Sequence, residues 1–236
     1  LARLIMGLLV HSKNKIKIIG DKSLSKRDFL RVTRPLEKFG AKFKTNFGKL
    51  PVVIEGTKNP IPVKYNENKG SAQCKSAVML AALNTKGKTI IKVKTSRNDS
   101  WLLIKHLGIP IKIINTKKDD LIKMDGKKKI KSFNYKIPSD ISSAAFFIVL
   151  TALSKNSKLN IKNVNINPSR TGILKILKIM GVKILLKKIK NYKGEKTADI
   201  YIGSSDLIKS IKCPSNLNSA SIDEFLLIFL VAAKAK

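Results

Sequence analysis

The sequence contains very little of several residue types, and each shortage excludes a class of protein. Its two cysteines, Cys74 and Cys213, lie far apart in a chain of 236 residues, which excludes a disulfide framework. Only two histidines accompany them, so a zinc site is not expected. The longest apolar run, residues 225–233, falls well short of the roughly 20 residues that span a bilayer. No secretory signal is visible, and we expect a cytoplasmic protein without a membrane partner.

Acidic residues are also scarce, because 15 Asp and Glu stand against 48 Lys and Arg, for a formal net charge of +33. Such a charge favours a polyanionic partner such as nucleic acid. However, 42 of the basic residues are lysines spread through every segment, and only 6% of the residues are aromatic. Nucleic-acid-binding proteins usually gather Arg and Lys on one face and add stacking aromatic side chains. We therefore favour a solvated lysine-rich surface without a specific nucleic-acid partner, with a nucleic-acid-binding module as the alternative.

What the sequence does contain is an internal repeat. Three segments share one pattern, an amphipathic helix followed by a glycine and an alternating strand: residues 36–43, 104–111 and 177–184. Their glycines, Gly40, Gly108 and Gly181, are 68 and 73 residues apart and suit the left-handed end of a helix. Apolar helices rich in small residues are predicted between them and at the chain ends, over residues 1–10, 71–83, 141–153 and 222–235.

Each copy of the repeat reads as a strand, a buried helix, a strand, an amphipathic helix and two further strands. Period-2 or β-branched patterns predict strands over residues 16–19, 52–55, 89–93, 159–164 and 199–202. A period of about 70 residues is longer than that of most solenoids, so we expect compact α/β subdomains. The polar stretch 127–138 is the best candidate for a domain boundary.

Three predicted helix starts, at residues 25–28, 96–99 and 221–224, fit the capping box, in which Ser and an acidic residue satisfy free backbone N–H groups. Capping does not explain the arginines, because Arg27 and Arg97 lie inside two of these starts and Arg170 opens another helix. A guanidinium group grips phosphate or carboxylate through two parallel hydrogen bonds, and a helix N-terminus adds N–H donors. These positions predict anion binding, with pairing to local carboxylates as the alternative.

Further candidates lie at the starts of the apolar helices. Gln73 follows the small residues Ser71 and Ala72, where a ligand can approach the backbone and the amide can both donate and accept. Asp140 is interpreted first as a simple N-cap and second as a ligand contact. Asp223 lies in the first turn of the last predicted helix, where a carboxylate is favoured with or without a catalytic role.

Taken together, five motifs closely resemble the ordered series of the 3-phosphoshikimate 1-carboxyvinyltransferase family: Gly-Asp-Lys-Ser-Leu-Ser-Lys-Arg at 20–27, Ser-Ala-Gln-Cys-Lys-Ser-Ala at 71–77, Asp-Ile-Ser-Ser-Ala-Ala-Phe at 140–146, Asn-Pro-Ser-Arg-Thr-Gly at 167–172 and Ile-Asp-Glu at 222–224. The resemblance runs through the whole chain. It implies the α/β enolpyruvyl transferase fold, a two-domain inside-out α/β barrel of repeated βαβαββ subdomains, here truncated at both ends. The first domain would be residues 1–137 without its start, and the second residues 138–236 without its end.

The resemblance also implies a reaction, the transfer of the enolpyruvyl group of phosphoenolpyruvate to the 5-hydroxyl of shikimate 3-phosphate. Phosphate is released, no metal or organic cofactor takes part, and the product serves aromatic amino acid biosynthesis. In this family's pattern Asp223 takes the proton of the 5-hydroxyl. The substrate contacts implied are Arg27 for phosphoenolpyruvate, Ser71, Ala72 and Gln73 for shikimate 3-phosphate, with Gln73 reaching both substrates, and Ser96 and Arg97 near shikimate 3-phosphate. The complete protein would be a monomer.

The chain also departs from the family. Residues 96–101 read Ser-Arg-Asn-Asp-Ser-Trp where many relatives read Ser-Arg-Asp-His-Thr-Glu. The family's opening Lys-Ser motif and its later Lys- and Arg-bearing motifs belong to regions outside this sequence, so we expect the 236 residues to be inactive alone. The nearest enzyme alternative is the sister transferase acting on UDP-N-acetylglucosamine, which uses a loop cysteine. Neither Cys74, inside a predicted helix, nor Cys213, before Pro214, fits that role.

Overall fold

The computed structural model describes residues 1–116 and 119–236, which form two compact units, Leu1–Ser132 and Phe133–Lys236. Each unit has its own cluster of buried apolar side chains. The division falls within the polar stretch 127–138. The assignment of residues 1–137 and 138–236 to two family domains stays a prediction. Within the described residues, no helix combines the length and the apolar character that crossing a membrane requires.

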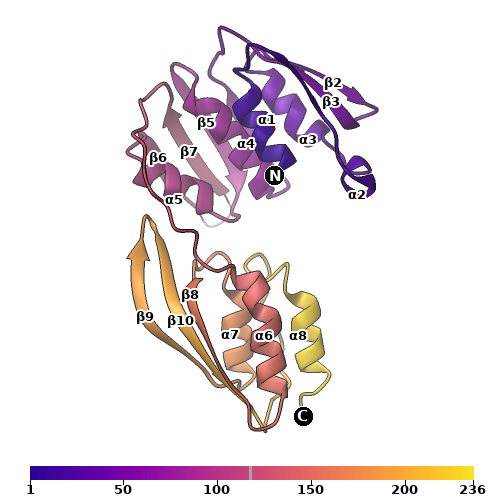
Figure 1. The fold of residues 1–236 in the computed structure, drawn as a ribbon, viewed down its shortest axis with the longest axis vertical. Helices are drawn as coiled ribbons and strands as arrows, with labels where there is room; N and C mark the ends of the chain where they lie inside the picture. The colour runs from indigo at the N-terminus through magenta and orange to yellow at the C-terminus, as the bar shows by residue number, and fades with distance from the viewer. Residues whose placement is uncertain (117–118) are drawn as a thin grey trace. The chain divides into compact units, whose positions relative to one another are not determined.

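Unit 1 contains the first two copies of the repeat (Figure 1). Its elements are α1 (Ala2–Leu9), β1 (Lys15–Ile18), α2 (Lys22–Ser25), α3 (Leu30–Glu37), β2 (Lys42–Asn46), β3 (Lys49–Glu55), β4 (Lys64–Glu67), α4 (Ala72–Leu83), β5 (Lys88–Lys94), α5 (Asp99–His106), β6 (Ile111–Asn115) and β7 (Asp119–Asp125). Unit 2 contains α6 (Ile141–Leu153), β8 (Lys158–Asn165), α7 (Gly172–Ile179), β9 (Ile184–Tyr192), β10 (Glu195–Gly203), the 3-10 turn η1 (Ser215–Leu217) and α8 (Phe225–Ala232).

The predicted repeat is confirmed in both its order and its geometry. The three sheets have strand orders β1-β3-β2, β4-β5-β7-β6 and β8-β10-β9, so the last strand of each copy always lies between two earlier ones. Strand β4 runs parallel to β5, whereas the remaining pairs are antiparallel. The predicted glycines end α3, α5 and α7 with φ values of +103° at Gly40, +73° at Gly108 and +93° at Gly181. Only glycine adopts such values without strain.

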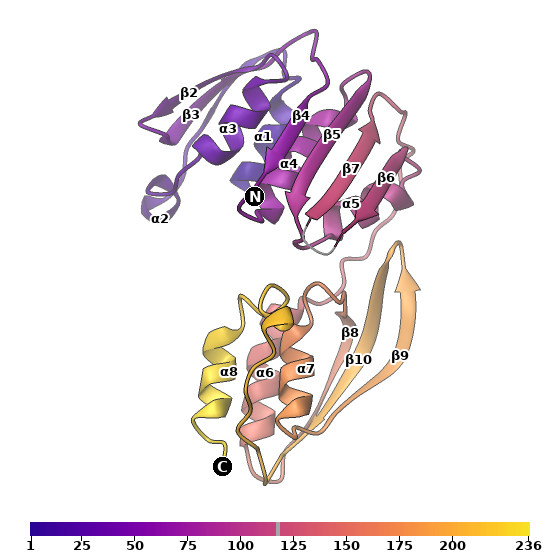
Figure 2. The same cartoon turned by 180° about the vertical axis from the view of Figure 1, so that it is seen from behind.

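Helix α4 is the central element of unit 1. It contacts α1, α3 and α5 as well as strands β5 and β7, and Figure 2 shows the four strands β4, β5, β7 and β6 with α4 behind them. Eight of its twelve residues are buried, which explains why it carries small and apolar residues on every side. In the sheet, Ile91 of β5 pairs with Ile122 of β7, and both side chains enter the core of the unit.

Unit 2 packs α6 against β8 and β10, and α8 against α6 and α7. Ile202 of β10 pairs with both Leu159 of β8 and Ile184 of β9, which places the apolar face of the sheet on the core. The prediction of a buried helix over residues 222–235 was wrong in two respects. The helix starts only at Phe225, because residues 222–224 form a turn. In addition, Leu226 is 81% exposed and Phe229 60% exposed.

Candidate functional site

The site in unit 1 is organised around the first turn of α4. Ser71 caps this helix, because its hydroxyl accepts from the N–H of Cys74 at 3.3 Å. The preceding loop is held by Glu67, whose carboxylate accepts from the N–H groups of Lys69 at 3.2 Å and Ser71 at 2.8 Å. Glu67 is only 6% exposed and lies 3.4 Å from the guanidinium of Arg31. A buried carboxylate is stable under these conditions because both charge and lone pairs find partners. The loop therefore presents Ser71, Ala72 and Gln73 in a defined conformation.

Arg3 of α1 connects two of the predicted substrate segments. Its guanidinium donates to Oε1 of Gln73 at 2.9 Å and to the backbone carbonyl of Asp28 at 3.0 Å. Asp28 directly follows Arg27, whose side chain is exposed on the connection between α2 and α3. Because Arg3 occupies the carbonyl oxygen of the Gln73 amide, the amide nitrogen is left to point elsewhere as a donor. The sequence analysis missed Arg3, since nothing in α1 marks it except the rarity of arginine in this chain.

Lys75 connects α4 to the segment that carries Ser96 and Arg97. Its ammonium donates to the Ser96 hydroxyl at 2.9 Å and to the Arg97 carbonyl at 2.5 Å, and lies 4.4 Å from the centre of the Trp101 ring. The side chain is fully buried. Burial lowers the pKa of Lys75 to about 8, against the opposing effect of nearby carboxylates. One buried lysine thus joins the helix of Gln73 to the segment of Ser96 and Arg97.

The predicted capping boxes are wrong at all three positions, because none of these serines is the N-cap of a helix: the N-caps are Asp21 of α2, Asn98 of α5 and Glu224 of α8. Ser25 ends α2 and donates to the carbonyl of Gly20, while Asp21 caps that helix through the N–H of Leu24. The Ser96 hydroxyl accepts from Lys75. The Ser221 hydroxyl donates to the carbonyl of Leu217 at 2.8 Å. In this chain the pattern Ser-x-x-acid does not predict which groups the serine side chain bonds.

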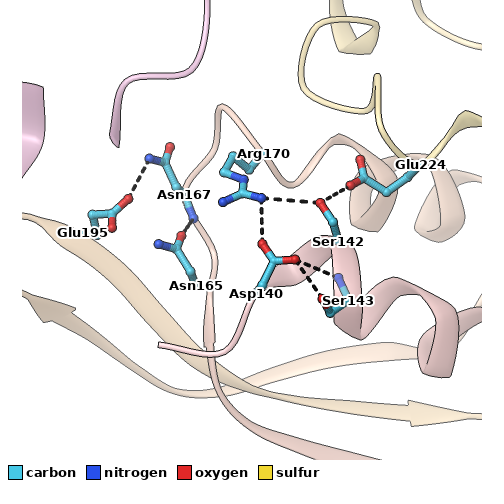
Figure 3. A network of polar contacts seen from close by, with 8 residues as sticks. All are labelled: Asp140, Ser142, Ser143, Asn165, Asn167, Arg170, Glu195 and Glu224. Carbon is cyan, nitrogen blue, oxygen red and sulfur yellow. Dashed lines mark hydrogen bonds and ion pairs between the residues drawn. The ribbon is translucent and has the colours of Figure 1, made fainter. Parts of the chain in front are cut away.

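In unit 2 a polar network surrounds the first turn of α6 (Figure 3). Asp140 caps the helix as predicted, accepting from the N–H of Ser143 at 2.8 Å. Arg170 donates to the other carboxylate oxygen at 2.6 Å and to the Ser142 hydroxyl at 3.4 Å. Partial burial alone would raise the pKa of Asp140, but the Ser143 N–H and the Arg170 charge outweigh it and hold the pKa below its ordinary value. Arg170 therefore pairs with a local carboxylate, which the sequence analysis gave as the alternative to anion binding.

The same network reaches the residue next to Asp223. The Ser142 hydroxyl donates to the carboxylate of Glu224, which is only 2% exposed, whereas the neighbouring Asp223 is exposed. The turn that carries both residues lies tightly against the start of α7. A Cβ atom on Gly172 would fall 2.0 Å from the Ser221 hydroxyl oxygen, so only glycine fits at this point. Asp223 is thus presented at the surface by a turn that is anchored on both sides.

Asn167 shapes the loop before Arg170. Its side-chain oxygen accepts from the N–H of Ser169 at 3.0 Å, and its amide nitrogen donates to Glu195 at 3.1 Å. Its own N–H donates to the side-chain oxygen of Asn165 at 2.8 Å. Figure 3 shows the contacts of Asn167 with Asn165 and Glu195. Together these contacts account for the Asn-Pro-Ser-Arg motif as a structural device that delivers Arg170 to Asp140.

Comparisons with known proteins agree with this architecture. The sequence profile of EPSP synthase (3-phosphoshikimate 1-carboxyvinyltransferase) matches residues 1–236. The chain belongs to the EPSP synthase family. A 3-phosphoshikimate 1-carboxyvinyltransferase of Ruthia magnifica is 40% identical over 235 residues, covering 99% of this chain and 53% of the relative. The corresponding protein of Caldicellulosiruptor bescii is 39% identical over 240 residues, covering 99% of this chain and 54% of that relative.

Solved structures confirm the enolpyruvyl transferase fold. The structure of EPSP synthase from Acinetobacter baumannii superimposes with a TM-score of 0.86 at 35% identity, over 100% of this chain and 53% of that one. The enolpyruvyl transferase NikO from Streptomyces tendae shares the fold with a TM-score of 0.64 at 12% identity, over 99% of this chain and 53% of that one. The chain spans about half the length of the curated family members it matches.

The sequence-predicted residues thus fall into two groups. Within unit 1, Gln73 is held by Arg3, and Ser96 and Arg97 are held by Lys75, so these three side chains belong to segments fixed to α4. Asp223 lies in unit 2, on the turn beside Glu224. Among the residues that the structure describes, no group of three or more His, Cys, Asp or Glu side chains is placed to hold a metal ion.

Proposed function

We propose that the complete protein transfers the enolpyruvyl group of phosphoenolpyruvate to the 5-hydroxyl of shikimate 3-phosphate. The observation that carries this proposal is the family match over all 236 residues, with relatives of that name near 40% identity. The first turn of α4 supports it, because the Arg3 guanidinium and the helix N-terminus place positive charge beside Gln73, and both substrates are anions.

In the proposed reaction the 5-hydroxyl oxygen attacks C2 of phosphoenolpyruvate while Asp223 takes the hydroxyl proton. C3 gains a proton from a general acid, which gives a tetrahedral intermediate. Transfer of a C3 proton back to the conjugate base of that acid and departure of phosphate from C2 then restore the double bond. We assign Ser71, Ala72 and Gln73 to shikimate 3-phosphate, with Gln73 also reaching phosphoenolpyruvate. Arg27 is assigned to phosphoenolpyruvate, and Ser96 and Arg97 to shikimate 3-phosphate. Exclusion of water would strengthen each of these ionic contacts.

The proposal includes two finer points, a monomeric state and a cytoplasmic location. The location is supported by the two free and widely separated cysteines, Cys74 and Cys213, which fit a reducing compartment. Cys74 is buried inside α4, which also argues against the loop cysteine of the sister transferase.

Replacement of Asp223 in the complete protein tests the proposal. Wild type should release phosphate from phosphoenolpyruvate only when shikimate 3-phosphate is present. Asp223→Asn should lower kcat by at least about 100-fold with little change in KM, since the lost proton acceptor acts in the transition state. Asp206→Asn, at another exposed position of unit 2, is the matched control and should retain wild-type turnover. Unchanged turnover in Asp223→Asn would refute the assigned role.

Two further measurements delimit the proposal. The 236 residues alone should show no turnover, because they span about half the length of their relatives. Turnover by this chain alone would contradict that expectation. The nucleic-acid alternative predicts salt-dependent binding to DNA or RNA and no response to shikimate 3-phosphate.

A further inference from the structure

Lys75 is the one buried lysine among those the structure describes, and the other described lysines are exposed or partly exposed. Its exposure is 0%, and the two groups that accept from its ammonium, the Ser96 hydroxyl and the Arg97 carbonyl, are both uncharged. Burying an ammonium is costly unless it is paired with a carboxylate and its hydrogen bonds are satisfied. A methionine would fill the same space in α4 at no such cost, so packing alone does not account for the lysine.

The contacts of Lys75 all lead to one segment. Ser96 and Arg97 lie in the connection between β5 and α5, Trp101 lies in the first turn of α5, and the Ser76 hydroxyl bonds that of Ser100 beside them. Residues 96–101 are thereby fixed to α4, whose first turn carries Gln73. This is also the segment that departs from the usual family pattern, since Trp101 stands where many relatives carry an acidic residue.

We propose that the ammonium of Lys75 is a positioning group that holds the Ser96–Arg97 segment in the conformation that binds shikimate 3-phosphate. This inference rests on the proposed function for the identity of the substrate. Lys75 itself touches no substrate. It acts by orienting the Ser96 hydroxyl and by holding the Arg97 backbone, so that the Arg97 guanidinium is delivered from a fixed point.

The surroundings of Lys75 make this device sensitive to pH. Its charge is disfavoured by burial and favoured by Asp120 of β7, Asp99 of α5 and Glu67 of β4. On the helices packed against α4, Arg3 is engaged with Gln73 and Arg31 with Glu67, whereas the side chains of Arg34, Glu37, Lys105 and His106 are exposed. The ammonium therefore loses its proton near pH 8, far below the range of an exposed lysine.

Kinetics of the complete protein test the proposal through Lys75→Met. The variant should raise KM for shikimate 3-phosphate by about 10- to 100-fold, the range expected when hydrogen bonds from a charged group are lost. KM for phosphoenolpyruvate should change less than about threefold. Lys175→Met, at an exposed position of α7, is the matched control and should change neither constant. A folded Lys75→Met protein with an unchanged ratio of the two KM values would overturn the proposal.

A second measurement needs no substrate. Trp101 is the one tryptophan of these 236 residues, and the Lys75 ammonium lies against its ring. The difference in fluorescence between wild type and Trp101→Phe isolates its emission, which should show a step near pH 8 that is absent in Lys75→Met. KM for shikimate 3-phosphate in wild type should rise across the same step.

These two readouts separate the possible failures. If wild type shows no turnover, the proposed function fails, and the Trp101 titration still decides whether the ammonium holds this segment. If Lys75→Met does not fold, the pH dependence of Trp101 emission and of KM for shikimate 3-phosphate in wild type takes the place of the variant. A Trp101 emission without a step near pH 8, or a KM for shikimate 3-phosphate that stays flat across it, overturns the inference.

Discussion

The Ser142 hydroxyl donates to the Glu224 carboxylate at 2.5 Å, and this contact joins the first turn of α6 to the turn that carries Asp223. Glu224 is buried while Asp223 is exposed, although the two are adjacent. The buried carboxylate therefore serves as an anchor, and the exposed one lies at the surface. Two neighbouring acidic residues thus have different tasks because the backbone turns between them.

Ser142→Ala should weaken this anchor. Loss of a hydrogen bond to a buried carboxylate should lower the free energy of unfolding by about 1–3 kcal/mol. Ser154→Ala removes a hydroxyl at the other end of α6 that bonds only the Leu150 carbonyl, and should cost less than about 1 kcal/mol. Urea unfolding of both variants measures the difference. Equal losses in the two proteins would contradict the anchoring role of Glu224.

Gly172→Ala should destabilise the protein through a clash. The added Cβ would lie 2.0 Å from the Ser221 oxygen and 2.9 Å from the backbone carbon of Ala220, so the turn before Asp223 must shift. Such overpacking typically costs about 1–3 kcal/mol. At Gly203 an added Cβ meets nothing within 4 Å, so Gly203→Ala is the matched control. Thermal unfolding should separate the two variants, and a similar melting temperature for both would speak against the close approach.

Arg170→Met should change the response of stability to acid. Because the pKa of Asp140 is lowered in the folded protein, its carboxylate stabilises the fold above the ordinary Asp pKa of about 3.9, and this stabilisation is lost as the pH falls through the lower folded value. Without the Arg170 charge the pKa of Asp140 rises toward its ordinary value, and the loss of folding stability on acidification becomes smaller. Urea unfolding at pH 5 and pH 3 tests this. The prediction fails if wild type and variant lose equal stability between these two pH values.

Lys75 predicts a dependence of the same sign at high pH, because its pKa is also lowered in the folded protein. Its folded pKa of about 8 lies below the ordinary lysine value of about 10.4, so between these values the unfolded chain binds more protons than the folded one. Stability should therefore rise with pH in this window, by at most about 1.4 kcal/mol per unit. Lys75→Met lacks this contribution. The free energy of unfolding of wild type minus that of the variant should increase from pH 8 to pH 10, and a constant difference would contradict the assigned burial.

Local patterns in the sequence were sufficient for the architecture. The apolar positions, the alternating strands and the glycines Gly40, Gly108 and Gly181 predicted the three copies of the repeat, and the helix over 141–153 was predicted to the residue. Asp140 was correctly interpreted as an N-cap. These features depend on the residues within one or two turns of each position, and such short-range preferences can be read directly from the order of amino acids.

The partners of the polar side chains could not be predicted in the same way. Arg3 and Gln73 are 70 residues apart, and Ser142 and Glu224 are 82 apart. Lys75 looked like one more lysine among 42, because nothing in its neighbours marks the difference between solvent and core. Which side chains meet, and which charge is buried, follows from the packing of whole helices and strands. That packing brings together segments whose separation in the chain leaves no local signal.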